Sequence, residues 1–204
     1  MEVSIRAYEE KDYMEMLEIT MELWNLKMEP YTKSGFEINK NIIDDTGTIP
    51  KRINEGILVA EVDKHIAGVV HLDFKGKKES KGESLSVLRL ILKYGLSRLI
   101  KARDMGIFFE HKVEDDELHI HGIVVSSKYR SMGLGSKLFD EVEKFAKKQK
   151  LKKITLEVLD SNIRAHTLYK RLGFKIVKQV EFSKQQQEYF ESKSHIYMMK
   201  QLED

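Results

Sequence analysis

The chain has 204 residues, of which 41% are hydrophobic and 33% are charged, enough apolar material for the core of an ordinary soluble domain. The formal net charge is +2, and lysine and arginine are scattered rather than gathered in the basic stripe typical of nucleic-acid-binding proteins. The chain has no cysteine, which excludes disulfides, thiolate metal sites and cysteine nucleophiles. Residues 1–12 are charged and have no apolar signal-peptide core, so we expect a cytoplasmic protein.

The first third of the chain predicts a strand, a helix and a hairpin. Residues 3–7 have the pattern of a short strand, and residues 10–25 that of a helix. Pro30 and Pro50 fall between this helix and the next strand, in a stretch of loop and short helix. Residues 56–74 contain two β-rich runs and predict a hairpin. The helix is expected to bury Met14, Leu17, Ile19 and Leu23.

Residues 75–115 predict a flexible polar loop (75–84) followed by a helix (85–103). The helix has a polar stripe at steps of three and four residues, with leucines filling the rest. Its basic residues make it a poor membrane span. It could lie on a membrane surface, or it could pack on its own domain or on a partner subunit, and the pattern favours the second interpretation. The stripe consists of Ser86, Arg89, Lys93, Ser97 and Lys101.

The second half alternates strands and helices, which predicts a mixed α/β fold with a central sheet. A glycine turn follows the first of these strands and precedes the first helix. The last two strands are expected to pair antiparallel across a long polar loop. The predicted strands are 117–125, 152–159, 175–182 and 194–202, and the predicted helices are 137–150 and 161–173.

The glycine turn, Gly133-Leu134-Gly135, predicts an anion site. A turn between a strand and a helix presents free backbone N–H groups at the positive end of the helix dipole, which suits a pyrophosphate. Glycines allow the backbone to approach such a ligand closely. A dinucleotide fingerprint would need a third glycine where the chain has Leu138, and the GKS or GKT sequence that a P-loop needs after four spacer residues is absent. Taken alone, the turn is equally compatible with a tight structural connection.

Two motifs together resemble the GCN5-related N-acetyltransferase (GNAT) superfamily. The first is Arg130-x-x-Gly133-x-Gly135, preceded by Val125, and the second is Asn162-x-x-Ala165-x-x-x-Tyr169-x-x-x-Gly173-Phe174. The resemblance covers about residues 3–74 and 116–202. It implies one N-acetyltransferase domain over residues 1–204, with a mixed, mostly antiparallel sheet flanked by helices. The segment at about 75–115 departs from the family plan and is interpreted as a helical insertion.

The resemblance implies acetyl-CoA as cosubstrate and assigns roles to specific positions. Backbone of Ile123, Val124 and Val125 would run beside the pantetheine arm, and the Val125 N–H would polarise the acetyl carbonyl. Asn162 would hydrogen-bond the pantetheine, and Tyr169 would donate a proton to the departing sulfur. The pyrophosphate would be held by backbone amides of Arg130, Ser131, Met132, Gly133, Leu134, Gly135 and Ser136.

His119 and His121 are candidates for the base. An alkyl amine is only about one part in a thousand neutral at pH 7, so its proton must be removed. Strand alternation places both imidazoles on one face, and histidine titrates near neutrality. The spacing is similar to that of arylalkylamine N-acetyltransferases, and His119 falls where histone-type members carry a glutamate. Two alternatives stay open: a metal site, for which no third ligand is evident, and simple polar residues of a half-exposed strand.

The sequence therefore predicts an acetyl-CoA-dependent N-acetyltransferase that acts by direct transfer in a ternary complex. The lack of cysteine excludes a cysteine-bound acetyl intermediate. The alternative is a non-catalytic acyl-CoA-binding or sensing module, and a third class is a docking module built on residues 85–103. The acceptor, a small-molecule or peptide amine, is not identified by any motif. No metal is expected, and a homodimer is one possible use of the insertion.

Overall fold

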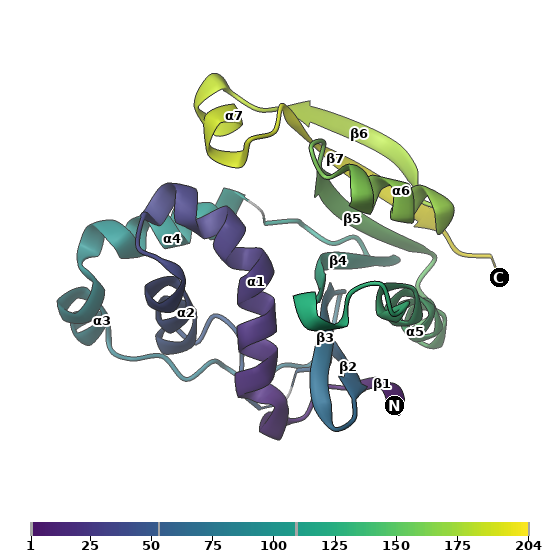
Figure 1. Ribbon diagram of the computed structural model, residues 1–204, viewed down its shortest axis with the longest axis horizontal. Coiled ribbons are helices and arrows are strands. Elements are labelled where there is room, and N and C mark those ends of the chain that lie inside the picture. Colours follow the sequence, from purple (N-terminus) through teal and green to yellow (C-terminus); the bar gives the residue numbers. More distant parts are fainter. Residues whose placement is uncertain (1, 53, 109, 204) are drawn as a thin grey trace.

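The computed structural model describes residues 2–52, 54–108 and 110–203, and within them the chain forms a seven-stranded sheet with the order β1-β2-β3-β4-β5-β7-β6 (Figure 1). All neighbouring strands are antiparallel except β4 and β5, which confirms the mixed, mostly antiparallel sheet. The extent of the single domain stays a prediction, and residues 1, 53, 109 and 204 lie outside the described part. The strands are β1 (Val3–Ala7), β2 (Ile57–Val62), β3 (His65–Asp73), β4 (Glu117–Val125), β5 (Lys153–Leu159), β6 (Lys175–Glu181) and β7 (Ser194–Gln201).

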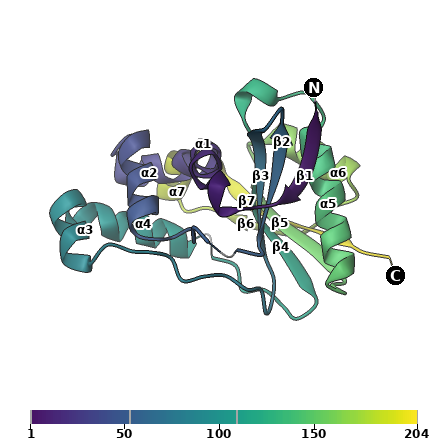
Figure 2. The ribbon, with the colours of Figure 1, turned by 90° about the horizontal axis from the view of Figure 1, so that it is seen from below.

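Helices cover both faces of the sheet (Figure 2). On one face lie α5 (Leu134–Lys148) and α6 (Ile163–Arg171). The helices α1 (Tyr13–Thr32), α2 (Phe36–Asp45), α3 (Val87–Tyr94), α4 (Leu96–Phe108) and α7 (Lys184–Phe190) lie on the other side, and two short 3-10 turns, η1 (Glu10–Asp12) and η2 (Ser127–Tyr129), complete the described elements. Each face has its own apolar core, built mainly on α5 and on α1 respectively.

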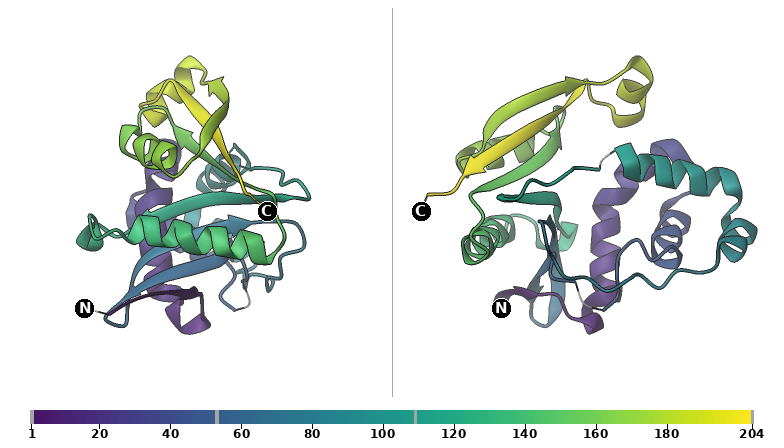
Figure 3. Two further views of the ribbon diagram at one scale, coloured as in Figure 1. Left: turned by 90° about the vertical axis from the view of Figure 1, so that its right-hand side faces the viewer. Right: turned by 180° about the vertical axis from the view of Figure 1, so that it is seen from behind.

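The two parallel strands, β4 and β5, pair over only part of their length. Glu117–Ile120 pairs with Lys153–Leu156, and beyond these residues β4 stays with β3 while β5 stays with β7. The two halves of the sheet therefore diverge (Figures 1 and 3). Main-chain groups on the facing edges of β4 and β5 have no partner strand in this gap, so the gap can accept an extended ligand.

A β-bulge in β4 changes which side chains face each layer. Leu72 pairs with Ile120 and His71 with Gly122, so His121 is the extra residue. Leu118 and Ile120 belong to the core on the α5 face, and after the bulge Ile123 and Val125 pack against that same core. Strict alternation from Ile120 would have put these two residues on the opposite face, because side chains alternate with a period of two.

Two expectations about the first helix and its end were wrong in detail. Met14 is 65% exposed, because it lies on the outer side of α1 while Leu17 and Ile19 are buried. Pro30 lies inside α1, which continues to Thr32 because tertiary contacts hold its last turns: Met28 is fully buried, and the Thr32 hydroxyl donates to Asn39 of α2.

The helix expected over residues 85–103 is two helices. Gly95 adopts φ +78° at the C-terminus of α3, a left-handed conformation that ends a helix, and α4 begins at Leu96. Over the described residues, no helix is both long and apolar enough to cross a membrane. The helix and strand predictions for the second half of the chain agree with the structure to within three residues at each end, including the antiparallel pairing of β6 with β7.

Candidate active site

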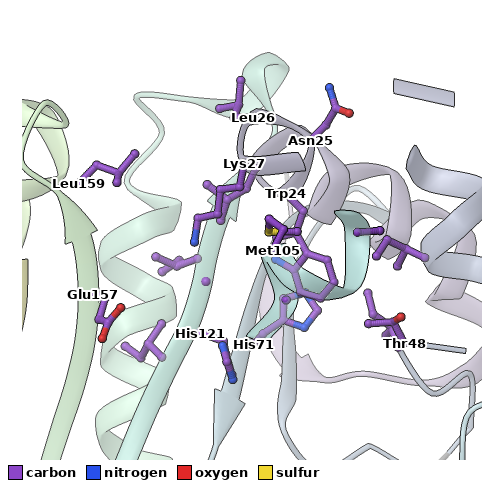
Figure 4. Close-up of a pocket in the computed structure, with 18 of the residues that line it drawn as sticks. Trp24, Asn25, Leu26, Lys27, Thr48, His71, Met105, His121, Glu157 and Leu159 are labelled. Atoms are coloured by element: carbon purple, nitrogen blue, oxygen red, sulfur yellow. The ribbon is translucent and has the colours of Figure 1, made fainter. Parts of the chain in front are cut away.

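A cavity of about 1250 Å³ opens where β4 and β5 part. Its walls come from both halves of the sheet and from α1, α2, α4, α6 and α7. Figure 4 shows Trp24 and Lys27 of α1 above the cavity, with His71 and His121 on the strands below them and Glu157 on the opposite strand. Five of the lining residues are site residues predicted from the sequence, namely His119, His121, Ile123, Asn162 and Tyr169. Most of the other lining residues were not singled out from the sequence.

The free edge of β4 exposes the backbone at the position predicted for the pantetheine arm. The Ser126 N–H donates to Ala67 O of β3 at 2.9 Å. Because consecutive N–H groups of a strand point to opposite edges, the Val125 N–H points away from β3 and into the gap beside β5. Ile123 has the same orientation as Val125 and lines the cavity, whereas the side chain of Val124 packs into the core on the α1 face.

The glycine turn ends at the N-terminus of α5. Gly133 is the residue before the helix and has φ +75°, where a side chain would be strained. A Cβ added to Gly133 would meet nothing within 4 Å, so the space beside the backbone is open. The N–H groups of Leu134, Gly135 and Ser136 begin the helix and have no acceptor within it, as an anion site requires.

The two glycines of the turn have different reasons to be glycine. Gly135 lies within the first turn of α5, without a positive φ, and a Cβ there would make an ordinary contact with Leu168 of α6 at 3.9 Å. The need for an unusual backbone conformation therefore applies to Gly133 alone. The contact also shows that the N-terminus of α5 lies beside α6, the helix that carries Tyr169.

Side chains of the turn fix it to the end of β4. Leu134 is buried with Ala67, and Met132 packs against the same cluster, which also contacts Val125. The Arg130 Nε donates to Val125 O at 3.3 Å, and its Nη2 lies 3.6 Å from a carboxylate oxygen of Glu22 on α1. Ser131 has φ +68° and is exposed. These side chains position the turn and leave its backbone N–H groups to bind a ligand.

Asn162 and Tyr169 line the cavity from α6. Asn162 caps this helix, because its Oδ1 accepts a hydrogen bond from the Ala165 N–H at 3.1 Å. Its amide nitrogen is thus the part that suits a ligand. Tyr169 is buried, with its ring 5.6 Å from Phe139 and 6.0 Å from Phe174. Burial raises the pKa of Tyr169 to about 12, so the hydroxyl keeps its proton and can donate it.

His119 and His121 both line the cavity, and their ring centroids are 5.4 Å apart. His119 is only 2% exposed, and burial, together with His111 and His121, lowers its pKa to about 2. Burial also lowers the pKa of His121, but its Nε2 lies 3.9 Å from Asp73, whose carboxylate acts in the opposite direction. Both imidazoles are therefore neutral at pH 7. A carboxylate oxygen lies 3.9 Å from each ring, Asp73 beside His121 and Glu117 beside His119, but only Asp73 raises the pKa of its histidine and so favours a proton that the histidine accepts.

His119 belongs to a buried hydrogen-bond network centred on the Glu117 carboxylate, which we call the Glu117 network. Thr155 donates to Glu117 Oε1, which also accepts from Tyr197 at 3.0 Å and lies 2.8 Å from His111 Nε2. Burial opposes the charge of Glu117, but the hydrogen bonds from Thr155, the Glu114 N–H and Tyr197 outweigh it and lower the pKa of Glu117.

The Glu117 network fixes the tautomer of His119. An ionised carboxylate only accepts, so the Thr155 hydroxyl must donate to Glu117. The Thr155 Oγ1 then accepts a hydrogen bond from His119 Nδ1, which lies 2.9 Å away. His119 therefore carries its proton on Nδ1 and has Nε2 as the acceptor nitrogen.

The four consecutive acidic residues at positions 114–117, which lead into β4, are of two kinds. Glu114 and Asp116 pair with Lys153, and Asp115 pairs with Lys75, as expected for a solvated turn. Only Glu117 turns inward, where it is 1% exposed. None of the three outer carboxylates is among the residues that line the cavity.

The fold brings together a candidate metal cluster that the spacing of the histidines did not reveal. One ligand atom each from His111, Glu117 and His119 lies within 4.8 Å of the others. The rings of His111 and His119 are stacked, however, with centroids 4.0 Å apart and planes inclined by 19°. An imidazole binds a metal in the plane of its own ring, so these two nearly parallel rings would have to turn before they could share an ion. The present arrangement suits hydrogen bonding to Glu117.

Two further titratable groups of the cavity come from segments without a motif. His71 of β3 lies 2.8 Å from the Thr20 hydroxyl, its ring is 5.5 Å from that of Trp24, and burial lowers its pKa to about 3. Lys27 extends from α1 toward the gap beside Glu157 (Figure 4). Burial lowers the pKa of Lys27 to about 8, against the opposing effect of the Glu157 carboxylate. The helix predicted over residues 10–25 did not distinguish Trp24 from its other residues, and Lys27 lies beyond the predicted end.

The inserted segment forms part of the cavity wall. Leu99, Ala102 and Met105 of α4 and Leu90 of α3 line it. They face further apolar lining residues from α2, β2 and the connection between them, namely Ile42, Ile43, Ile49, Pro50 and Ile57. The part of the cavity between α1, α2 and α4, which we call the apolar lobe, is therefore lined largely by aliphatic side chains.

Comparison with known proteins gives one family and a consistent fold. The model of the acetyltransferase (GNAT) family matches residues 14–174. Among solved structures, Ard1 from Thermoplasma volcanium is 16% identical, with a TM-score of 0.58 over 100% of each chain. The PaiA N-acetyltransferase from Thermoplasma acidophilum, solved in complex with coenzyme A, is 17% identical with a TM-score of 0.58 over 99% of this chain and 100% of that one. The ribosomal-protein-S18-alanine N-acetyltransferase from Escherichia coli is 14% identical, with a TM-score of 0.54 over 100% and 96%.

Proposed function

The chain belongs to the acetyltransferase (GNAT) family and is an acyltransferase, and we propose that it transfers the acetyl group of acetyl-CoA directly to a primary amine in a ternary complex. The observation that carries this proposal is the gap between β4 and β5, which has a free strand edge on one side and an anion-binding helix N-terminus beyond it. We therefore set aside the non-catalytic acyl-CoA-binding module considered from the sequence.

Residues of this chain fit acetyl-CoA along the whole gap. The N–H groups at the start of α5 and the open space beside Gly133 suit the pyrophosphate. The free edge of β4 at Ile123 and Val125 suits the amides of the pantetheine arm, and the Asn162 amide nitrogen suits a carbonyl of the same arm. The coenzyme A bound to the similarly folded PaiA N-acetyltransferase from Thermoplasma acidophilum supports this choice of ligand.

His121 is our candidate for the base, with His119 as its neutral neighbour. The acceptor ammonium must lose a proton before its nitrogen can attack. His121 can take that proton directly or through one water, and Asp73 stabilises the imidazolium that results. His119 is held neutral by burial and oriented by the Glu117 network, so it suits the positioning of the amine or of a water. This choice between the two histidines rests on their surroundings in the fold.

Transfer then breaks one bond and forms one. The neutral amine attacks the acetyl carbonyl carbon, the Val125 N–H stabilises the negative charge on the carbonyl oxygen, and the bond from carbon to sulfur breaks. Tyr169 donates its proton to the departing sulfur, and the second proton lost by the attacking nitrogen restores the Tyr169 hydroxyl. The products are the amide, free coenzyme A and one proton released from the original ammonium.

The apolar lobe favours a particular kind of acceptor. Aliphatic residues of α2, α3 and α4 and the indole of Trp24 surround a space adjacent to His71 and His121. Carboxylates also line the cavity, namely Glu29, Glu79, Glu157 and Glu191. A polyamine or a free amino acid that lay along the aliphatic side chains of the apolar lobe would nevertheless place charged groups against them, which is costly. We therefore propose an amine with an apolar body, whose amino group reaches His121 while the body occupies the apolar lobe.

The experiment that tests this function combines binding and turnover. Isothermal titration with acetyl-CoA should show binding, and Gly133→Val should weaken it by about tenfold or more because a branched side chain is strained at this φ and fills the anion site. Gly135→Ala is the matched control and should remain folded and bind with little change. Free-thiol release with a panel of apolar amines, polyamines and amino acids then identifies the acceptor class.

Three results would contradict the proposal. Absence of acetyl-CoA binding would remove the cofactor assignment. If acetyl-CoA binds but no amine causes thiol release, the result would favour the non-catalytic acyl-CoA-binding module. Preference for polyamines or free amino acids would leave the acetyltransferase assignment intact but overturn the assignment of the apolar lobe.

A further inference from the structure

The two inserted helices expose a row of apolar side chains to solvent. Leu88 and Leu92 of α3 are 68% and 78% exposed, and Leu96 and Ile100 of α4 are 56% and 39% exposed. The two residues of each helix are four positions apart, with the break at Gly95 between the two pairs, and we call these four residues the outer row. Figures 1 and 2 place α3 at the end of the molecule farthest from α5 and α6, with α4 leading back from it. The outer row therefore lies away from the acetyl-CoA gap.

The outer row is not part of the core that these helices form. The opposite sides of α3 and α4 carry Leu90 and Tyr94, and Leu99 and Ala102, which pack in one cluster around Ile42 of α2. These residues account for the packing expected of an amphipathic helix on its own domain. The outer row is additional, since each helix has apolar side chains on two sides. Exposed apolar residues gathered in this way mark an interaction surface.

Basic residues accompany the outer row. The segment 87–108 contains five basic residues and one acidic residue, Asp104, so its formal charge is +4 while the rest of the chain has −2. Lys93 is neutralised by Asp45, and Arg103 pairs with Asp104. Arg89, Arg98 and Lys101 are exposed, and Arg89 and Lys101 each follow directly after a residue of the outer row.

We propose that the outer row docks α3 and α4 onto the surface of an anionic lipid membrane. Leucine and isoleucine side chains enter the boundary between headgroups and acyl chains, and the neighbouring arginines and lysine contact anionic headgroups. A second copy of this chain is a poorer occupant, because a symmetric contact would bring two sets of these basic side chains together. This surface lies on the other side of the helices from the apolar lobe, so the inference is independent of the proposed function.

Vesicle co-sedimentation of the full chain tests this inference. Vesicles of equal parts phosphatidylglycerol and phosphatidylcholine should carry the protein down, and vesicles of phosphatidylcholine alone should not. The double variant Leu88→Glu/Leu92→Glu and the double variant Arg89→Glu/Lys101→Glu should each reduce binding by about tenfold or more. Met14→Glu, which changes an exposed apolar residue of α1, is the matched control and should bind like the wild type.

Folding of each variant is checked by its thermal unfolding and its acetyl-CoA binding, since none of these positions lines the cavity. Failure of the wild type to bind anionic vesicles overturns the inference, and so does undiminished binding by the Leu88→Glu/Leu92→Glu variant. Light scattering decides the main alternative: a dimer that the same leucine variant dissociates, without vesicle binding, would assign the outer row to a second copy of the chain.

Discussion

The two halves of the cavity are built in different ways. The half assigned to acetyl-CoA comes from one continuous stretch, from β4 through the glycine turn, α5 and β5 to α6. The half assigned to the acceptor is assembled from α1, α2, β3, α3, α4 and α7, which are scattered over the rest of the chain. A site made of neighbouring segments leaves a readable motif, whereas a site assembled from distant segments leaves none.

The chemistry of the two halves differs as well. Acetyl-CoA is assigned mainly to backbone N–H groups, and these depend on strand register and on one positive φ at Gly133. The acceptor half relies on side chains whose pKa values are lowered by burial, including His71 and Lys27. Backbone sites tolerate many side chains, so their signature is a pattern of glycines. Side-chain sites depend on what the rest of the fold packs around them.

The largest expected effect is that of Tyr169→Phe, in the acetyl-CoA half. The ring contacts with Phe139 and Phe174 survive, but the proton donor is lost, so kcat should fall about 1000-fold while the Kd for acetyl-CoA stays within about twofold. Thiol release and calorimetry measure the two quantities. Tyr31→Phe, on α1, is the control. A fall in affinity that matched the fall in kcat would make Tyr169 a binding residue instead.

His121→Gln tests the proposed base, which lies between the two halves of the cavity. The rate at pH 7 should fall about 100-fold, and the deficit should largely disappear by pH 9, because the neutral fraction of the acceptor amine rises about 100-fold over that range. Because burial lowers the pKa of His121, the wild-type kcat/KM should decline only below the ordinary histidine range. His65→Gln provides an exposed comparison. An equal deficit at every pH would argue against a base, and a larger effect of His119→Gln would move the role to His119.

His71 gives a pH dependence of stability that belongs to the acceptor half alone. Its pKa is about 3 in the folded chain and about 6.5 when unfolded, so its stabilisation is complete above pH 6.5 and declines as the pH falls below it. Between pH 7 and pH 5 this amounts to about 2 kcal/mol of unfolding free energy. Urea unfolding of wild type and His71→Gln at both pH values should show that the variant loses that part of the dependence. An unchanged pH dependence would mean that His71 is not held neutral.

The smallest expected effect is that of filling the apolar lobe. Ala102→Phe adds an aromatic ring to the cavity side of α4 and should raise the KM for the acceptor about tenfold, with the Kd for acetyl-CoA unchanged, because the lobe loses space for the acceptor body. Ile100→Phe places the same ring on the exposed side of the same helix and should leave both quantities as they are. Equal KM values for the two variants would show that α4 is not a wall of the acceptor site.

Local patterns in the sequence were sufficient to predict the strands and helices that form the half assigned to acetyl-CoA. The alternation of 117–125 and the turn at Gly133 predicted β4 and the start of α5, and the second motif predicted α6 with Tyr169 on its inner side. These signals depend on short-range rules: strand alternation, the φ that only glycine adopts readily, and helix periodicity. His119 and His121 line one cavity, as strand alternation predicted, although His121 is itself the extra residue of the bulge.

Tertiary structure alone decided the surroundings of these groups. It separated the two histidines, because His119 is enclosed by the Glu117 network from β5 and β7 while His121 lies at a bulge beside Asp73. It also extended α1 through Pro30 and turned one side of α4 toward the cavity and the other toward solvent. Each of these depends on contacts between residues far apart in the chain. Burial and neighbouring charges set the pKa of a side chain, and tertiary contacts hold the last turns of α1. A single segment of the sequence encodes neither its own burial nor those contacts.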